Sequence, residues 1–184
     1  MTLLSSVGAC LLLDTTSLIS LFASRRMDQI IQALPVPVAV VAEVAVHEAK
    51  YIRGADGIVL EPIDLQPLVT TGLLVTVPLT ATDCALAVNL VAQCNIDNGE
   101  SLTAAVALRL GGSVVTDDRV AQQRIGQLLA HLPFFATSQI LQVWATASSV
   151  PDRDIRSVLQ QMHHGGNYQP DVRDQGYTWL RTYL

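Results

Sequence analysis

Residues 94–124 read CNIDNGESLTAAVALRLGGSVVTDDRVAQQR and place acidic side chains on both sides of a long apolar run. Ser101–Leu110 is apolar except for three side chains, which predicts a helix buried on most of its circumference and ended by two glycines. Residues 113–116 predict a short strand, and so apolar a strand is typical of the middle of a parallel sheet. Open α/β sheets bind ligands at the carboxyl ends of their strands, so Asp117 and Asp118 mark the expected site.

The segments on either side predict alternating strands and helices. Strands are expected at Ala9–Leu13, at Leu73–Leu79 and, as an edge strand, at Leu132–Phe135. Helical patterns lie between them, which predicts an α/β sandwich around a mainly parallel sheet in residues 1–150. Only helices are expected further on, so residues 151–184 are predicted to form a C-terminal helical appendage packed on or extending from that domain.

The composition limits the classes of protein that this chain can belong to. Its 184 residues give room for one domain with a full core, and half of them are hydrophobic while 15% are charged. Sixteen acids against eleven bases give a net charge of −5, which argues against a general nucleic-acid coat protein held by clustered Lys and Arg. An enzyme that meets phosphates through metal ions is not excluded, because bound divalent cations would offset the acids.

The cysteines and the apolar runs bear on where in the cell the protein is expected to be. Three cysteines without CxxC spacing predict neither a disulfide framework nor a zinc site, and a reduced cytoplasmic location is expected. No Lys or Arg precedes residues 7–10, so no signal peptide is expected there. Asp14, Glu43 and Asp83 interrupt the longest apolar segments, so no membrane span is expected either.

Two acids stand in apolar surroundings. Asp14 ends the first strand, where a helix N-cap is the alternative interpretation to a functional acid. Glu43 is the only charge in Val38–Val46, which we interpret as part of a helix over Val38–Tyr51, and its burial there without a partner or a metal would be costly. Glu48 is expected to point elsewhere, to the surface.

Two of the acids at the expected site, Asp97 and Glu100, could instead serve to cap a helix. Asp97 and Glu100 have the Asp-x-x-Glu spacing of a capping box before an apolar run. Carboxylates from several segments that converge without Lys or Arg would nevertheless raise one another's pKa values. Mg²⁺ or Mn²⁺ would resolve that conflict, because these cations take oxygen ligands and activate a bound water for attack on a phosphodiester.

Three segments together resemble a PIN-domain protein. They are LLLDTTSLISL at 11–21, VPVAVVAEV at 36–44 and DNGESLTAAVALRLGGSVVTDDR at 97–119. Their order and spacing, over about residues 9–150, are similar to the branch with D-x-G-E followed by an acid pair, many of whose members are predicted toxin-type nucleases. The resemblance implies a PIN-like three-layer sandwich in residues 1–150 and a metal-dependent endoribonuclease that requires Mg²⁺ or Mn²⁺.

The resemblance also implies roles for individual residues. The catalytic acids would be Asp14, Glu43, Glu100 and Asp118, and these four with Asp117 would bind the metal. Thr116 takes the place of the threonine in the T-x-D motif, and Asp97 is the first acid of D-x-G-E. The chain departs from the family at Thr16, where many members carry Asn or Ser, and at Glu100, where many carry Asp.

Further expectations concern orientation and partners. Adjacent residues that leave a strand point in opposite directions, and we expect Asp118 to face Asp14 while Asp117 caps a helix or supports the site. Arg119 and Arg124 follow the acid pair and are expected to guide RNA phosphates. The expected partners are an RNA substrate, a small antitoxin protein that covers the acids with an Arg, and a second copy of the chain.

Other classes of protein also place acids at strand ends. A receiver domain or an aspartyl phosphatase needs a lysine near its phosphoryl group, and Lys50, the only lysine, is expected on a helix. A dinucleotide-binding domain is disfavoured because neither GxGxxG nor GK[ST] occurs. The alternative that remains is a catalytically degenerate PIN module that binds RNA or a protein partner.

Overall fold

The structure, a computed structural model, describes residues 7–54 and 58–184 and is built on a parallel sheet. Its five strands have the order β5-β2-β1-β6-β7, and every pairing between neighbours is parallel. The strands are β1 (Leu11–Leu13), β2 (Val38–Val41), β5 (Leu74–Val77), β6 (Ser113–Val115) and β7 (Phe134–Phe135). The prediction of an α/β protein with a mainly parallel central sheet is confirmed.

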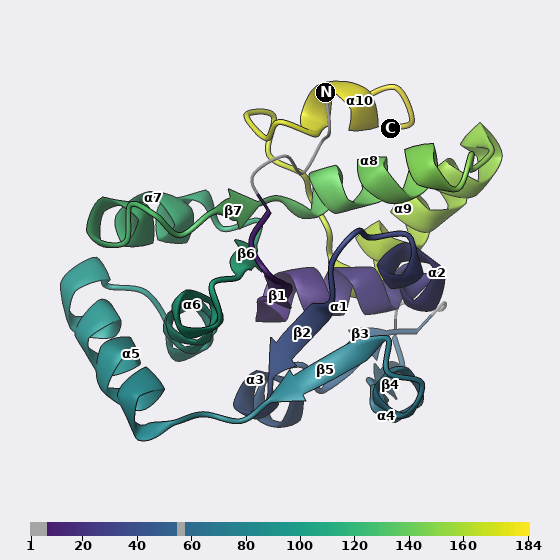
Figure 1. Ribbon diagram of the computed structural model, residues 1–184. Coiled ribbons are helices and arrows are strands. Elements are labelled where there is room, and N and C mark those ends of the chain that lie inside the picture. The colour runs from purple at the N-terminus through teal and green to yellow at the C-terminus, as the bar shows by residue number, and fades with distance from the viewer. Residues whose placement is uncertain (1–6, 55–57) are drawn as a thin grey trace.

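Helices cover both faces of this sheet (Figure 1). The helices on one face are α1 (Thr15–Ala23), α2 (Met27–Gln32), α8 (Thr137–Ala147) and α9 (Asp152–Gly166). Those on the other face are α5 (Ala81–Cys94), α6 (Asn98–Leu110) and α7 (Arg119–Leu128). Helix α6 packs directly on β1, β2 and β6 with α5 outside it, so the arrangement is compatible with a three-layer sandwich.

The central strands explain one wrong prediction. Every residue of β1 and β2 is buried, so these strands are apolar throughout and show no alternation. Periodicity cannot separate such a strand from a buried helix, which is why the helix expected over Val38–Tyr51 is in fact β2 followed by the short α3 (Ala42–His47). Glu43 is therefore the second residue of a helix that begins at the carboxyl end of β2.

The remaining elements lie around this sandwich. Strands β3 (Tyr51–Arg53) and β4 (Leu60–Pro62) form a separate antiparallel pair, and α4 (Gln66–Thr70) precedes β5. Helix α9 packs on α1, and α10 (Tyr177–Leu180) packs on α8. The buried side chains of α9 belong to the same hydrophobic core as the strands, while the division into residues 1–150 and 151–184 stays a prediction.

Two findings concern the expectations about targeting. In the described ranges no helix has the length and apolar character needed to cross a bilayer. Residues 1–6, on which the prediction of no signal peptide partly depends, lie outside the described residues.

Candidate active site at the carboxyl edge of the sheet

Asp14 joins β1 to α1 and is the N-cap of that helix. Its Oδ1 accepts the backbone N–H of Ser17 at 2.7 Å, and its Oδ2 accepts the hydroxyl of Thr16 at 2.9 Å. The residue is 2% exposed. Burial raises its pKa above the ordinary value, although hydrogen bonds from Thr116, Ser17 and Thr16 lower it in part. The capping interpretation is thus correct, and the carboxylate is also buried without an ion pair among the described residues.

Asp117 is a half-buried acid at the same edge. Its Oδ1 accepts the backbone N–H of Thr137, the first residue of α8, at 2.8 Å. Part of the side chain keeps contact with solvent, but burial among protein atoms raises its pKa to about 7. The hydrogen bonds from Thr137 lower this pKa, and the negative charges of Asp14 and Asp174 raise it. Asp117 is therefore close enough to Asp14 for the charge of Asp14 to raise its pKa, while the expectation that Asp118 faces Asp14 stays a prediction. We call Asp14 and Asp117 the inner pair.

Glu100 and Asp118 form a second pair, the outer pair. The Glu100 N–H donates to Asp97 Oδ1 at 2.8 Å and the Asp97 N–H donates to Glu100 Oε2 at 3.2 Å, so the predicted capping box is present. Burial raises the pKa of Glu100 to about 7, and the negative charges of Asp97 and Asp118 add to this. Asp118 is exposed and caps α7 by accepting the Ala121 N–H at 2.8 Å. Its own N–H donates to the hydroxyl oxygen of Thr116.

Glu43 follows the carboxyl end of β2, the strand next to β1. Its Oε2 is buried and has no hydrogen-bond partner. A buried carboxylate oxygen without a partner is costly, so its environment favours a cation or a water that would satisfy it.

Glu48 reaches the same region, although we expected it to point away. The hydroxyl of Thr15 donates to its carboxylate, and that carboxylate occupies the space that a side chain at position 99 would need. The Glu48 carboxylate thus lies between Thr15, which follows Asp14, and Gly99, which precedes Glu100. The sequence held no signal for this, because a helix continued through Tyr51 would have turned Glu48 away, whereas α3 ends at His47.

The two arginines predicted to guide RNA have different environments. Arg124 donates to the carbonyl oxygens of Cys94 and Asn95 at 3.1 and 2.7 Å, at the C-terminal end of α5. Arg119 pairs with Asp174, whose Oδ1 lies 3.1 Å from Nη1. Both arginines therefore have structural contacts, Arg124 with backbone carbonyl groups and Arg119 with a buried acid.

The segment after α9 adds two residues that sequence reasoning missed. Asp174 and Tyr168 are 6% and 5% exposed, and both carry a buried oxygen without a hydrogen-bond partner. Burial raises the pKa of Tyr168 well above its ordinary value, and the charges of Asp117 and Asp174 add to this. Only the fold brings Tyr168 and Asp174 close to Asp117 of the inner pair, because no motif near them in the sequence resembles a functional site.

The carboxylates of the inner and outer pairs would suit a cation that needs few protein ligands. In the described ranges, no group of three or more His, Cys, Asp or Glu is arranged to hold a metal ion. Mg²⁺ commonly takes one or two carboxylates and keeps several waters, which suits pairs of acids. Burial raises the pKa values of Asp14, Asp117 and Glu100, and no Lys or Arg contributes a lowering effect to these three acids. The residues that would hold the ion are the inner and outer pairs.

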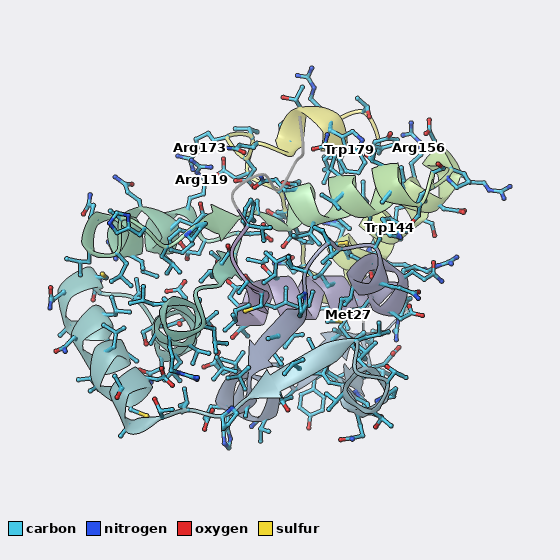
Figure 2. All side chains as sticks on the ribbon, viewed as in Figure 1. Met27, Arg119, Trp144, Arg156, Arg173 and Trp179 are labelled. Carbon is cyan, nitrogen blue, oxygen red and sulfur yellow. The ribbon has the colours of Figure 1, made fainter. Side chains whose placement is uncertain are left out.

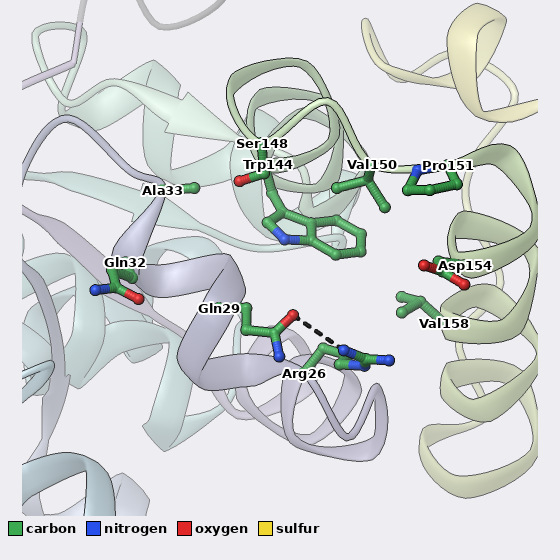
Figure 3. A pocket seen from close by; sticks show the side chains of 10 residues that line it. All are labelled: Arg26, Gln29, Gln32, Ala33, Trp144, Ser148, Val150, Pro151, Asp154 and Val158. Atoms are coloured by element: carbon green, nitrogen blue, oxygen red, sulfur yellow. Dashed lines mark hydrogen bonds between the residues drawn. The ribbon is translucent and has the colours of Figure 1, made fainter.

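One cavity lies away from these acids. It has a volume of about 410 Å³ between α2, α8 and α9, and its lining includes Arg26, Trp144 and Asp154 (Figure 3). Trp144 and Thr137 lie in opposite halves of α8, and only Thr137 contacts the inner pair. This cavity is therefore not part of the acidic site.

No family model, no curated protein and no solved structure matches this chain. The resemblance to PIN-domain proteins therefore depends on the sequence motifs alone. What the fold and the site define is an α/β protein with a parallel sheet and two acid pairs at the carboxyl edge.

Proposed function

We propose that this chain is a metal-dependent endoribonuclease that hydrolyses phosphodiester bonds and acts as the toxin of a toxin–antitoxin pair. The observation that supports the proposal most is the convergence of Asp14 with Asp117 and of Glu100 with Asp118, without an intervening Lys or Arg among the described residues. Charge left uncompensated in this way favours divalent cations. The motifs that resemble PIN-domain proteins lead to RNA as the substrate.

The chain itself would supply orientation and proton transfer. The N–H groups of Ser17, Asp97 and Ala121 hold the carboxylates of Asp14, Glu100 and Asp118, so these acids are preorganised at the starts of helices. Bound Mg²⁺ or Mn²⁺ would lower the pKa of a water that attacks phosphorus and would offset charge on the phosphate. Glu100 and Asp117, with pKa values of about 7, can exchange protons near neutral pH.

The same excess of carboxylate is the basis for the proposed partner. A small antitoxin protein that inserts an Arg between the acid pairs would form charge-assisted hydrogen bonds and exclude the substrate. Toxicity on expression that a neighbouring open reading frame relieves is the expected pattern. A second copy of the chain is a further proposed partner, in keeping with the resemblance.

A specific observation favours one alternative, a catalytically degenerate module that binds RNA or a protein. Asp14, Asp97 and Asp118 each use a carboxylate oxygen to cap a helix, and the described residues hold no group of three metal-capable side chains. Acids that serve only as caps would leave the surface without catalysis.

The decisive experiment compares cleavage of single-stranded RNA with Mg²⁺ or Mn²⁺, with EDTA, and by Asp14→Asn. We expect cleavage that requires the metal and falls at least about 100-fold in Asp14→Asn, since even a residue that only supports a metal ligand can be worth 10- to 100-fold. Asp28→Asn is the matched control, because Asp28 is an exposed acid in the first turn of α2. Cleavage that persists in EDTA or in Asp14→Asn overturns the proposal, and RNA binding without cleavage favours the degenerate module.

A further inference from the structure

A second cavity lies between the first turns of α7, strand β7 and Arg173. Its volume is about 350 Å³, within the usual range for small-ligand sites. It is lined by Arg119, Val120, Gln122, Gln123, Phe134 and Arg173. Arg119 directly follows Asp118 in the chain, which connects this cavity to the outer pair through the start of α7. We call it the Arg119–Arg173 cavity.

Two guanidinium groups on this cavity are held in place by acids. Arg119 Nη1 pairs with the buried Asp174, and its other N–H groups make no hydrogen bond within the described residues. Arg173 uses Nε and Nη2 to pair with Asp171, and its side chain is 69% exposed. Figure 2 shows Arg119 and Arg173 close together in the upper part of the view, and both line this cavity. Planar guanidinium groups with free donors suit recognition of a phosphate group, and the paired carboxylates compete with that phosphate for their charge.

The other side chains suit a base. Phe134 lies in the edge strand β7 with its side chain partly exposed to the cavity, and an aromatic ring stacks on any base. Gln123 is exposed on α7 and carries both a donor and an acceptor for the edge of a base. Gln122 is already engaged, since its amide donates to the Thr116 carbonyl oxygen at 2.7 Å. The N-terminal end of the ten-residue α7 adds a positive partial charge near the arginines.

We propose that the Arg119–Arg173 cavity binds one nucleotide of a single-stranded RNA next to the phosphodiester that meets the acid pairs. The phosphate of this nucleotide lies against Arg119 and Arg173, and its base lies against Phe134 and Gln123. The strand is single because a base must leave its stack to reach an aromatic side chain. The choice of RNA rests on the proposed function, while the cavity is a site of its own.

The test measures binding of a short fluorescently labelled single-stranded RNA to the full chain in EDTA, where metal-dependent cleavage does not proceed. Arg173→Gln should weaken binding and reduce the slope of log affinity against log salt by about 0.7, the value for one phosphate contact to a single strand. Phe134→Leu should weaken binding at least about fivefold through lost stacking. Arg153→Gln is the matched control, because Arg153 on α9 is 86% exposed and lies outside the cavity.

A fourth variant is expected to change binding in the opposite direction. Asp171→Asn removes the charge that holds Arg173 and keeps an oxygen to accept the Arg173 backbone N–H. Binding should tighten about two- to fivefold, the scale of one exposed ion pair, and a loss of folded protein cannot produce this result.

The outcomes separate this proposal from the proposed function. RNA that does not bind, or that binds all variants equally, overturns the nucleotide site even where metal-dependent cleavage is present. Binding that depends on Arg173 and Phe134 supports the site even in a protein that cleaves nothing, and in that case only the nuclease proposal fails.

Discussion

Asp14 and Asp83 are both acids at helix starts, both are 2% exposed, and their pKa values shift in opposite directions. Asp14 caps α1 and accepts the hydroxyl of Thr16. Asp83 lies in the first turn of α5 and accepts the N–H and the hydroxyl of Thr80, each at 2.8 Å. Their hydrogen bonds to threonine and backbone are similar, so these do not explain the difference.

The difference comes from Arg109 and from the greater depth of Asp14 among protein atoms. Burial raises the pKa of both acids, but at Asp83 the hydrogen bonds from Arg109 and Thr80 and the charge of Arg109 outweigh it, and the pKa falls below its ordinary value. The Arg109 Nε lies 2.9 Å from Asp83 Oδ1. Asp14 has no such cation and its pKa is raised. The chain thus neutralises a buried acid that holds α5 to α6 and leaves the acid at the carboxyl edge uncompensated.

The largest expected effect is the difference in folding stability between Asp83→Asn and Asp14→Asn, each of which removes the charge of one acid. Asp83→Asn should cost about 1.5–3 kcal/mol, because a charge-assisted hydrogen bond to Arg109 is lost. Asp14→Asn should leave the melting temperature equal or higher, since its amide oxygen still accepts the Ser17 N–H and no cation loses a partner. Thermal unfolding of both variants at neutral pH in EDTA is the measurement. A larger loss for Asp14→Asn than for Asp83→Asn would contradict the comparison.

The second expected effect is a dependence of stability on pH with opposite signs for the two kinds of acid. Glu100 and Asp117 have folded pKa values of about 7 against ordinary values of 4.5 and 3.8, so their contribution is fully present below those ordinary values and is lost as pH rises through about 7. Asp83, with a lowered pKa, contributes above 3.8 and loses its contribution as pH falls further. Unfolding by urea in EDTA should therefore show decreasing stability between pH 5 and pH 8.

The double variant Glu100→Gln, Asp117→Asn is the control for this profile. Its stability should change less with pH over that interval, because neither side chain titrates. Mg²⁺ should restore stability to the unchanged protein above neutral pH by binding the folded state alone. Stability in EDTA that is constant or rises across the interval would count against uncompensated acids at the edge.

The smallest expected effect concerns the two threonines. Thr80→Val removes the N-cap oxygen of α5 and should cost about 1 kcal/mol. Thr16→Val should cost less, about 0.5 kcal/mol, because the Ser17 N–H and the Thr116 hydroxyl still hold Asp14. Urea unfolding at neutral pH distinguishes them. Equal losses would mean that Asp14 depends on its hydroxyl partner as much as Asp83 does.

Several parts of the fold and the site follow from local patterns. The glycines after Leu110 end α6 as expected, and the spacing of Asp97 and Glu100 predicted a capping box that is present. The location of Asp14 and Asp117 at one edge also followed, because parallel strands end on the same side of a sheet. The hydrogen bond that orients Asp117 did not follow, since its donor, the N–H of Thr137, belongs to a segment 20 residues further along the chain.

By itself the sequence determined the alternation of strands and helices, the helix caps and the presence of acids where β1 and β6 end. Each of these depends on interactions between residues close in the chain, or on apolar runs that must be buried. The tertiary structure alone decided that Val38–Val41 is a strand, because a segment buried on both sides has no periodicity to distinguish it from a helix. It also decided that Arg109 neutralises Asp83 while Asp174 joins Asp117, because partners brought together from distant segments leave no pattern in the chain between them.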